Sequence, residues 1–149
     1  MIRSLEEKDI DAIVELEKEC FNDAWSREAI LRDVETNDLA RHFVLEKEGK
    51  IIGYIFFWIT FDSATIINLA VEKEERKKGY GQRLLEACIE ACEAEGCEFL
   101  TLEVRASNKA AQSLYKKNGF MCVNIKKGYY TDNYEDALYM VKPLMIGEL

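Results

Sequence analysis

Residues 64–104 constrain the fold more than any other part of this sequence, because the hydrophobic period changes twice within them. Residues 64–71 are rich in β-branched side chains, as strands are. Apolar residues then repeat at helical spacing over residues 84–92, Gly96 supplies a stop, and residues 99–104 return to a strand pattern. We therefore expect a βαβ unit whose two strands are parallel members of one sheet.

The rest of the chain adds helices and strands on both sides of this unit. Asp9, Ser26 and Asn108 each precede a helical stripe and can cap it. Short connections make the three strands before the long helix an antiparallel meander. We predict an α/β fold with one mixed sheet in the order β-α-α-β-β-β-α-β-α-β-β, forming a single domain over residues 1–149. The expected strands are 2–5, 42–46, 50–60, 64–71, 99–104, 120–125 and 137–141.

Charge excludes some classes of protein. The 149 residues carry a net charge of −8, which argues against general nucleic-acid binding and favours a cationic partner. The longest apolar run, residues 51–61, is shorter than the roughly 20 residues of a membrane span. The first 20 residues are too acidic for a signal peptide. We expect a cytoplasmic protein that binds neither nucleic acid nor membrane.

Cysteine usage fits that compartment. There are five cysteines, one histidine and no CxxC pair. Cys88 and Cys92, four residues apart on one helix face, invite a metal hypothesis, but a single histidine gives it little support. Cys88 and Cys92 continue the apolar stripe of the long helix and act there as small hydrophobic residues. We therefore expect reduced thiols and no metal.

Glycines and basic residues gather where the first strand of the βαβ unit turns into its helix. Residues 73–83 carry a local charge of +3, which leaves −11 for the rest of the chain. Gly79 and Gly81 let backbone N–H groups approach a ligand, and the start of a helix favours an anion such as phosphate. The alternative is a solvated loop that simply enters a helix. The flanking cations are Arg76, Lys77 and Lys78, which could add a bidentate fork.

Two common phosphate motifs do not fit this turn. A dinucleotide fingerprint needs a third glycine where Leu84 stands, and it follows the first strand of its fold. A nucleotide P-loop needs Gly-Lys-Ser/Thr, whereas Gly81 is followed by Gln82 and Arg83.

Glu103 lies near the carboxyl end of an otherwise apolar strand, where ligands gather in open α/β sheets. A half-buried carboxylate there is costly unless it is paired or used, and burial would suit it to general-base work. The structural alternative is an ion pair with Arg105 or Lys109.

Asn108 and Tyr115 follow on the next helix. Asn108 is expected as the N-cap, with an amide that could also contact a ligand. Tyr115 lies two turns further along the same face. It is either a packed aromatic or a phenol that donates a proton to a departing anion.

Taken together, these segments resemble a known family. Arg76-x-x-Gly79-x-Gly81 after a strand resembles the acetyl-CoA motif of the GCN5-related N-acetyltransferases (GNAT), and the element order is similar along essentially the whole chain. Within that family, residues 102–108 and the Tyr129-Tyr130 pair resemble the RimI type. Those bacterial enzymes acetylate the N-terminal alanine of small ribosomal subunit protein eighteen.

The resemblance implies roles for individual residues. Glu103 would be the general base and Tyr115 the general acid of a direct transfer from acetyl-CoA to an amine, without metal or acyl-enzyme. The partner would be the basic N-terminal peptide of a ribosomal protein. The residues implied to bind acetyl-CoA are Leu69, Ala70, Val71, Arg76, Lys77, Lys78, Gly79, Tyr80, Gly81, Gln82 and Asn108.

The acceptor is the less constrained half of this interpretation. Ala24 stands where the RimI type usually has proline, and residues 126–128 replace a stretch that usually contains arginine. The alternatives are a GNAT enzyme that acetylates a lysine side chain, a polyamine or another small amine, a non-catalytic acetyl-CoA-binding module, and an RNA-associated module, which the acidity disfavours.

Overall fold

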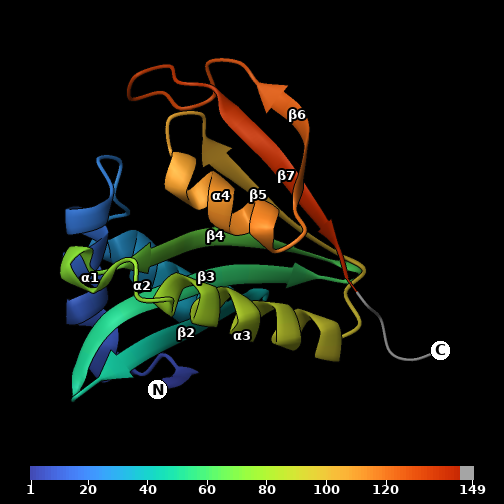
Figure 1. Cartoon of the computed structure of the whole chain (residues 1–149). Coiled ribbons are helices and arrows are strands. Elements are labelled where there is room, and N and C mark those ends of the chain that lie inside the picture. The colour runs from blue at the N-terminus through green and yellow to red at the C-terminus, as the bar shows by residue number, and fades with distance from the viewer. Residues whose placement is uncertain (145–149) are drawn as a thin grey trace.

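Figure 1 shows a single mixed sheet with helices on both faces. The computed structural model describes residues 1–144. The predicted order of helices and strands is confirmed, and most ends lie within one or two residues of their predicted places. The strands are β1 (Ile2–Ser4), β2 (Ala40–Lys47), β3 (Lys50–Thr60), β4 (Ser63–Val71), β5 (Phe99–Arg105), β6 (Met121–Lys126) and β7 (Ala137–Pro143). The helices are α1 (Ile10–Cys20), α2 (Arg27–Thr36), α3 (Tyr80–Ala94) and α4 (Lys109–Lys117), with 3-10 turns η1 (Glu7–Asp9) and η2 (Lys73–Glu75).

The parallel pair predicted for the βαβ unit is present, but it is short. The strand order is β1-β2-β3-β4-β5-β7-β6, and β4 and β5 are paired only at Ser63–Phe99, Ala64–Leu100 and Thr65–Thr101. Beyond these positions the two strands diverge, as Figure 1 shows. This leaves a gap between the carboxyl-terminal halves of two central strands.

Each face of the sheet has its own core. The larger core contains α3 and the even-numbered residues Leu100, Leu102 and Val104 of β5. The smaller core contains α1 and α2 against the other face. Since side chains alternate along a strand, Glu103 and Arg105 point to the α1 and α2 side.

A bulge in β4 changes which side chains face α1. Phe56 pairs with Asn68 and Phe57 pairs with Ile66, so Ile67 is an extra residue in β4. Ile67 packs against the smaller core, and the next residue, Asn68, reaches helix α1 by hydrogen bonds to Glu17. The bulge therefore lies beside the gap between β4 and β5.

Two of the three predicted helix caps are confirmed. Ser26 accepts a hydrogen bond from the Ala29 amide, and Asn108 accepts one from the Ala111 amide, each at 3.1 Å. The third prediction is wrong in its chemistry. Asp9 stands at the N-cap of α1, but its carboxylate makes no capping bond. It instead accepts two hydrogen bonds from Arg3, at 2.7 and 2.9 Å, and one from the Glu6 amide.

All five cysteines are free thiols, as predicted. Cys88, Cys92 and Cys97 are fully buried between α3 and the sheet, whereas Cys122 is exposed on β6. Burial raises the pKa of Cys97 to about 11. Within residues 1–144 no group of three histidine, cysteine or acidic side chains is placed to hold a metal ion. None of the helices in this described part is long and apolar enough to cross a membrane.

Candidate active site

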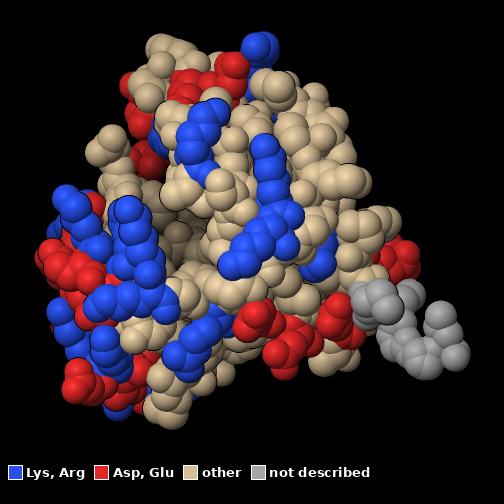
Figure 2. All heavy atoms as spheres, in the orientation of Figure 1, with Lys and Arg blue, Asp and Glu red and all other residues tan. Residues whose placement is uncertain are grey.

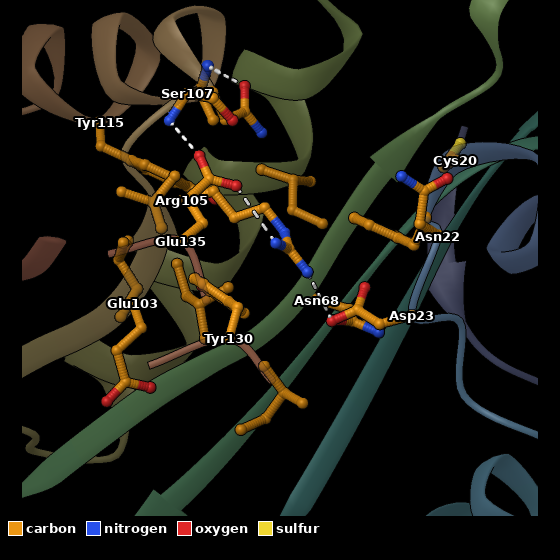
Figure 3. Close-up of a pocket in the computed structure, with 18 of the residues that line it drawn as sticks. Cys20, Asn22, Asp23, Asn68, Glu103, Arg105, Ser107, Tyr115, Tyr130 and Glu135 are labelled. Atoms are coloured by element: carbon orange, nitrogen blue, oxygen red, sulfur yellow. Dashed lines mark hydrogen bonds and ion pairs between the residues drawn. The ribbon is translucent and has the colours of Figure 1, made fainter. Parts of the chain in front are cut away.

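The gap between β4 and β5 opens into a cavity of about 500 Å³. Leu69 of β4 and Glu103 of β5 line its two sides, and Tyr115 of α4 lines it from the α3 and α4 face. Residues of the α1–α2 connection and of the β6–β7 connection line it from the opposite face, as Figure 3 shows. The cavity therefore passes through the sheet and can be approached from both faces.

The turn at residues 76–82, which we call the phosphate turn, has the backbone geometry of an anion site. Gly79 has φ +86° at the N-cap of α3, and Lys77 has φ +65°. No side chain caps this helix start, so its first N–H groups have no intrahelical partner. Together with the positive end of the helix dipole, these groups can bind a phosphate.

The side chains of the turn are engaged differently from the sequence expectation. The guanidinium of Arg76, expected as a fork for the ligand, donates to the Val71 carbonyl at 2.9 Å and to the Cys20 sulfur at 3.4 Å. Gln82 exchanges hydrogen bonds with Asn118, the residue that follows α4. The turn therefore presents main-chain donors, and these two side chains instead fix it to its neighbours.

Basic side chains stand on both sides of the hollow seen in Figure 2. One group precedes and begins α3, and the other lies on α4. Their position beside the turn suits a ligand with several phosphates. In the sequence, the basic residues of the first segment are Lys73, Arg76, Lys77, Lys78 and Arg83, and those of α4 are Lys109, Lys116 and Lys117.

Glu103 is held by donors from outside β5. Lys126 of β6 donates to one carboxylate oxygen, and the Tyr129 hydroxyl donates to the other at 3.3 Å. The Lys126 ammonium also lies 4.9 Å from the ring centroid of Tyr139. This hydrogen bond to Glu103 raises the pKa of Lys126, which stays charged at neutral pH. The structural alternative, an ion pair of Glu103, is therefore present, but its partner is Lys126 and not either of the two examples expected, Arg105 and Lys109.

Tyr115 is 6% exposed and packs edge-on against Phe120, with ring centroids 5.4 Å apart. No hydrogen bond within residues 1–144 involves its hydroxyl, and Tyr115 lines the cavity. Burial raises the pKa of Tyr115, so the phenol stays protonated. A protonated phenol with an unused donor in a cavity can deliver a proton.

A buried carboxylate missing from the sequence predictions stands behind the β4 bulge. Glu17 of α1 is 1% exposed and accepts hydrogen bonds from Tyr54, from Asn68 at 3.1 Å and from the Trp25 amide at 2.9 Å. It thereby fixes Asn68, which lines the cavity, to the α1–α2 connection. A signal existed, because Glu17 lies four residues after Ile13 on the apolar stripe of its helix.

Arg105 forms the densest ionic cluster of the site. Its guanidinium pairs with Asp23 at 3.0 Å, Asp132 at 2.9 Å and Glu135 at 3.2 Å, and it stacks 4.0 Å from the ring centroid of Tyr130. These contacts connect β5 with two segments far from it in sequence, the α1–α2 connection and the β6–β7 connection. Sequence reasoning did not identify this cluster, because its members are joined only by the fold.

A divergent parallel strand pair, a helix start with unused amides and a cavity that crosses the sheet define the acetyltransferases of the GNAT class. The chain matches the Acetyltransferase (GNAT) family over residues 10–120, and it belongs to this family. It is an N-acetyltransferase that uses acetyl-CoA.

Individual relatives narrow the comparison. A protein of Bacillus subtilis (strain 168) is 40% identical over 139 residues, covering 93% of this chain and 92% of the relative. The [ribosomal protein bS18]-alanine N-acetyltransferase of Escherichia coli (strain K12) is 36% identical over 145 residues, covering 96% and 97%. The crystal structure of the ribosomal-protein-S18-alanine N-acetyltransferase from Escherichia coli superposes with a TM-score of 0.90 at 36% identity, over 99% of this chain and 96% of that one.

Proposed function

We propose that this enzyme acetylates the N-terminal alanine of ribosomal protein bS18. The relatives named for this activity are similar over nearly their full length. A ribosomal N-terminus is a basic peptide, which suits a chain of net charge −8 whose basic residues cluster beside the phosphate turn.

One observation carries the proposal. Tyr115 lines the cavity from the α3 and α4 side, whereas Glu103 belongs to the opposite face of β5. An acid and a base on opposite sides of one gap suit a transfer in which donor and acceptor arrive from different faces. The donor side is the one that carries the phosphate turn.

The donor fits the residues present on that side. Acetyl-CoA, when bound, supplies the acetyl group as a thioester. The amides of Lys77, Lys78, Gly79, Tyr80, Gly81 and Gln82 would hold its phosphates. Asn108, which lines the cavity, would also contact the cofactor. Leu69, Ala70 and Val71 would line its arm, and Arg76 would fix the turn through the Val71 carbonyl.

The chemical step uses two residues of the chain. Glu103 accepts the proton of the acceptor amine, whose pKa of roughly 7.7–8.0 leaves part of it neutral already. The amine nitrogen forms the amide bond with the acetyl carbonyl carbon as the carbon–sulfur bond breaks, and Tyr115 gives its proton to the departing sulfur. Burial raises the pKa of Tyr115, so the phenol is protonated before this step. The Glu103 carboxylate must exchange a contact with Lys126 or Tyr129 for one with the amine.

The proposal is tested by CoA release with three basic peptides. The first starts with a free alanine, the second has the same sequence with a blocked N-terminus and an internal lysine, and the third is blocked without lysine. We expect turnover on the first alone. Turnover only on the lysine peptide would make the enzyme a lysine acetyltransferase and contradict the proposed acceptor.

Two substitutions test the residue roles. Glu103→Gln and Tyr115→Phe are each expected to lower kcat about 100-fold or more with little change in the KM of acetyl-CoA, as removal of an acid or a base does. Glu98→Gln is a matched control at an exposed position that does not line the cavity. Wild-type turnover in either active-site variant would contradict the role assigned to that residue.

A further inference from the structure

The α1–α2 connection, residues 21–26, and the β6–β7 connection, residues 127–136, border the cavity on the face opposite to α3 and α4. Figure 3 shows the Arg105 guanidinium extended from β5 toward Asp23 of the first connection, with Glu135 of the second on its other side. Within residues 1–144, every hydrogen bond and ion pair that joins the two connections passes through Arg105. We call this arrangement the Arg105 clasp.

We propose that the Arg105 clasp positions the acceptor peptide by fixing the distance between the two connections. The inference rests on the proposed function only in taking this opening as the acceptor's entrance. Arg105 itself touches no reacting atom, so it is a positioning residue. Its planar fork serves several carboxylates at once, which the single ammonium of a lysine cannot do.

Arg105 is paired with a well-fixed acid on one side and a weakly fixed acid on the other. The weaker contact is the one that breaks more easily. Glu135 is 14% exposed and also accepts a hydrogen bond from the Ser107 amide at 2.6 Å, so it is fixed to the end of β5 in two ways. The Asp23 side chain is 46% exposed, and its only ion pair within residues 1–144 is with Arg105. The contact to Asp23 is therefore the one that joins the α1–α2 connection to Arg105, whereas the Trp25 amide joins the same connection to Glu17.

A competing explanation is simple charge attraction. The three acids outnumber Arg105, so the cluster could draw a cationic peptide without holding the connections at all. The two explanations predict opposite effects of Arg105→Gln on peptide binding. If charge alone matters, Asp23→Asn should weaken peptide binding and Arg105→Gln should strengthen it. If the clasp matters, both should weaken it.

The experiment measures KM for a basic alanine-started peptide and for acetyl-CoA in both variants. We expect each variant to raise the peptide KM about tenfold, as loss of a charged hydrogen bond does, with the KM of acetyl-CoA within twofold. The double variant should be no worse than Arg105→Gln alone, because Arg105→Gln already removes the contact that Asp23→Asn removes. A lowered peptide KM in Arg105→Gln, or multiplicative effects in the double variant, would overturn the clasp.

A matched control removes a similar ion pair elsewhere. Asp11 of α1 pairs with Arg27 of α2 at 2.7 Å on an exposed surface that does not line the cavity. Asp11→Asn is expected to leave both KM values unchanged. Arg105→Lys should restore part of the contact to Asp23 and fall between wild type and Arg105→Gln.

A second measurement does not need activity. Hydrogen exchange of the ligand-free protein should speed up in residues 21–26 in both Asp23→Asn and Arg105→Gln, while the strands of the larger core stay protected. Unchanged exchange in these residues would overturn the clasp whatever the enzyme acetylates. Faster exchange in a protein without turnover on the alanine peptide would contradict the proposed function and leave the clasp intact.

Discussion

The ionised carboxylate of Glu135 is stabilised by its hydrogen-bond and ion-pair partners. Glu135 takes a hydrogen bond from the Ser107 amide and an ion pair from Arg105. These partners, the Ser107 hydrogen bonds first, lower the pKa of Glu135 from 4.5 to about 2. The folded protein therefore favours the ionised form more strongly than the unfolded chain does.

This pKa shift predicts how stability depends on pH. The contribution of Glu135 is fully present above about pH 4.5 and is lost as the pH falls from 4.5 toward 2, because the unfolded chain binds the proton first. Urea unfolding at pH 5, 4 and 3 should show a decline that is shallower in Glu135→Gln. Equal declines in the two proteins would contradict the assignment.

At the same scale, the sequence indicated which side chains matter better than it indicated their partners. Glu103 was identified as a carboxylate that needs a partner, but Lys126 was not found. The reason lies in the sheet order, since β7 separates β5 from β6 and Lys126 reaches across Tyr139. No local spacing contains that information.

Among the elements, the start of α3 combines local conformation with ligand binding. Gly79 has φ +86°, and an added Cβ there would meet no atom within 4 Å. Gly49, in the turn between β2 and β3, has φ +78° and equally open surroundings. The two glycines therefore share a backbone conformation, but only Gly79 stands at the start of α3.

This pair allows a controlled substitution. Gly79→Ala and Gly49→Ala should each cost about 1 kcal/mol of unfolding free energy, the strain of an L-residue in the left-handed region. Only Gly79→Ala should raise the KM of acetyl-CoA, about fivefold, since it distorts the amides of the turn. Urea unfolding and steady-state kinetics check both parts, and an equal KM for the two variants would contradict the phosphate role of the turn.

Helices and strands themselves were predictable because their signals are local. The periodicity of α3, the cap residues Ser26 and Asn108, and the turn before β3 each act within a few residues. The Asp9 cap failed for the opposite reason. Arg3 of β1 offers a stronger, bidentate partner that exists only once β1 lies beside the start of α1.

Across the whole molecule, the sheet has its least extensive strand pairing between β4 and β5 among the central strands. Only three paired positions connect the β1–β4 part to the β5–β7 part directly. A ligand that occupies the gap contacts both parts. It should therefore stabilise the molecule as a unit rather than one half of it.

Ligand binding should accordingly raise the free energy of unfolding. At a CoA concentration 100 times its Kd, the expected increase is about 2.7 kcal/mol. Urea unfolding with and without CoA measures it, and Gly79→Ala at the same CoA concentration should show a smaller increase. An increase that is absent in wild type, or undiminished in the variant, would contradict binding at the turn.

The three buried thiols of the larger core allow the opening of that core to be measured from the rate at which they are modified. A thiol reagent can reach Cys122 in the native state, but it reaches Cys88, Cys92 and Cys97 only when the larger core opens. Their rate of modification therefore reports how often the larger core opens, and no engineered cysteine is needed. The same helix begins at the phosphate turn, so that rate also records how strongly a bound ligand holds it closed.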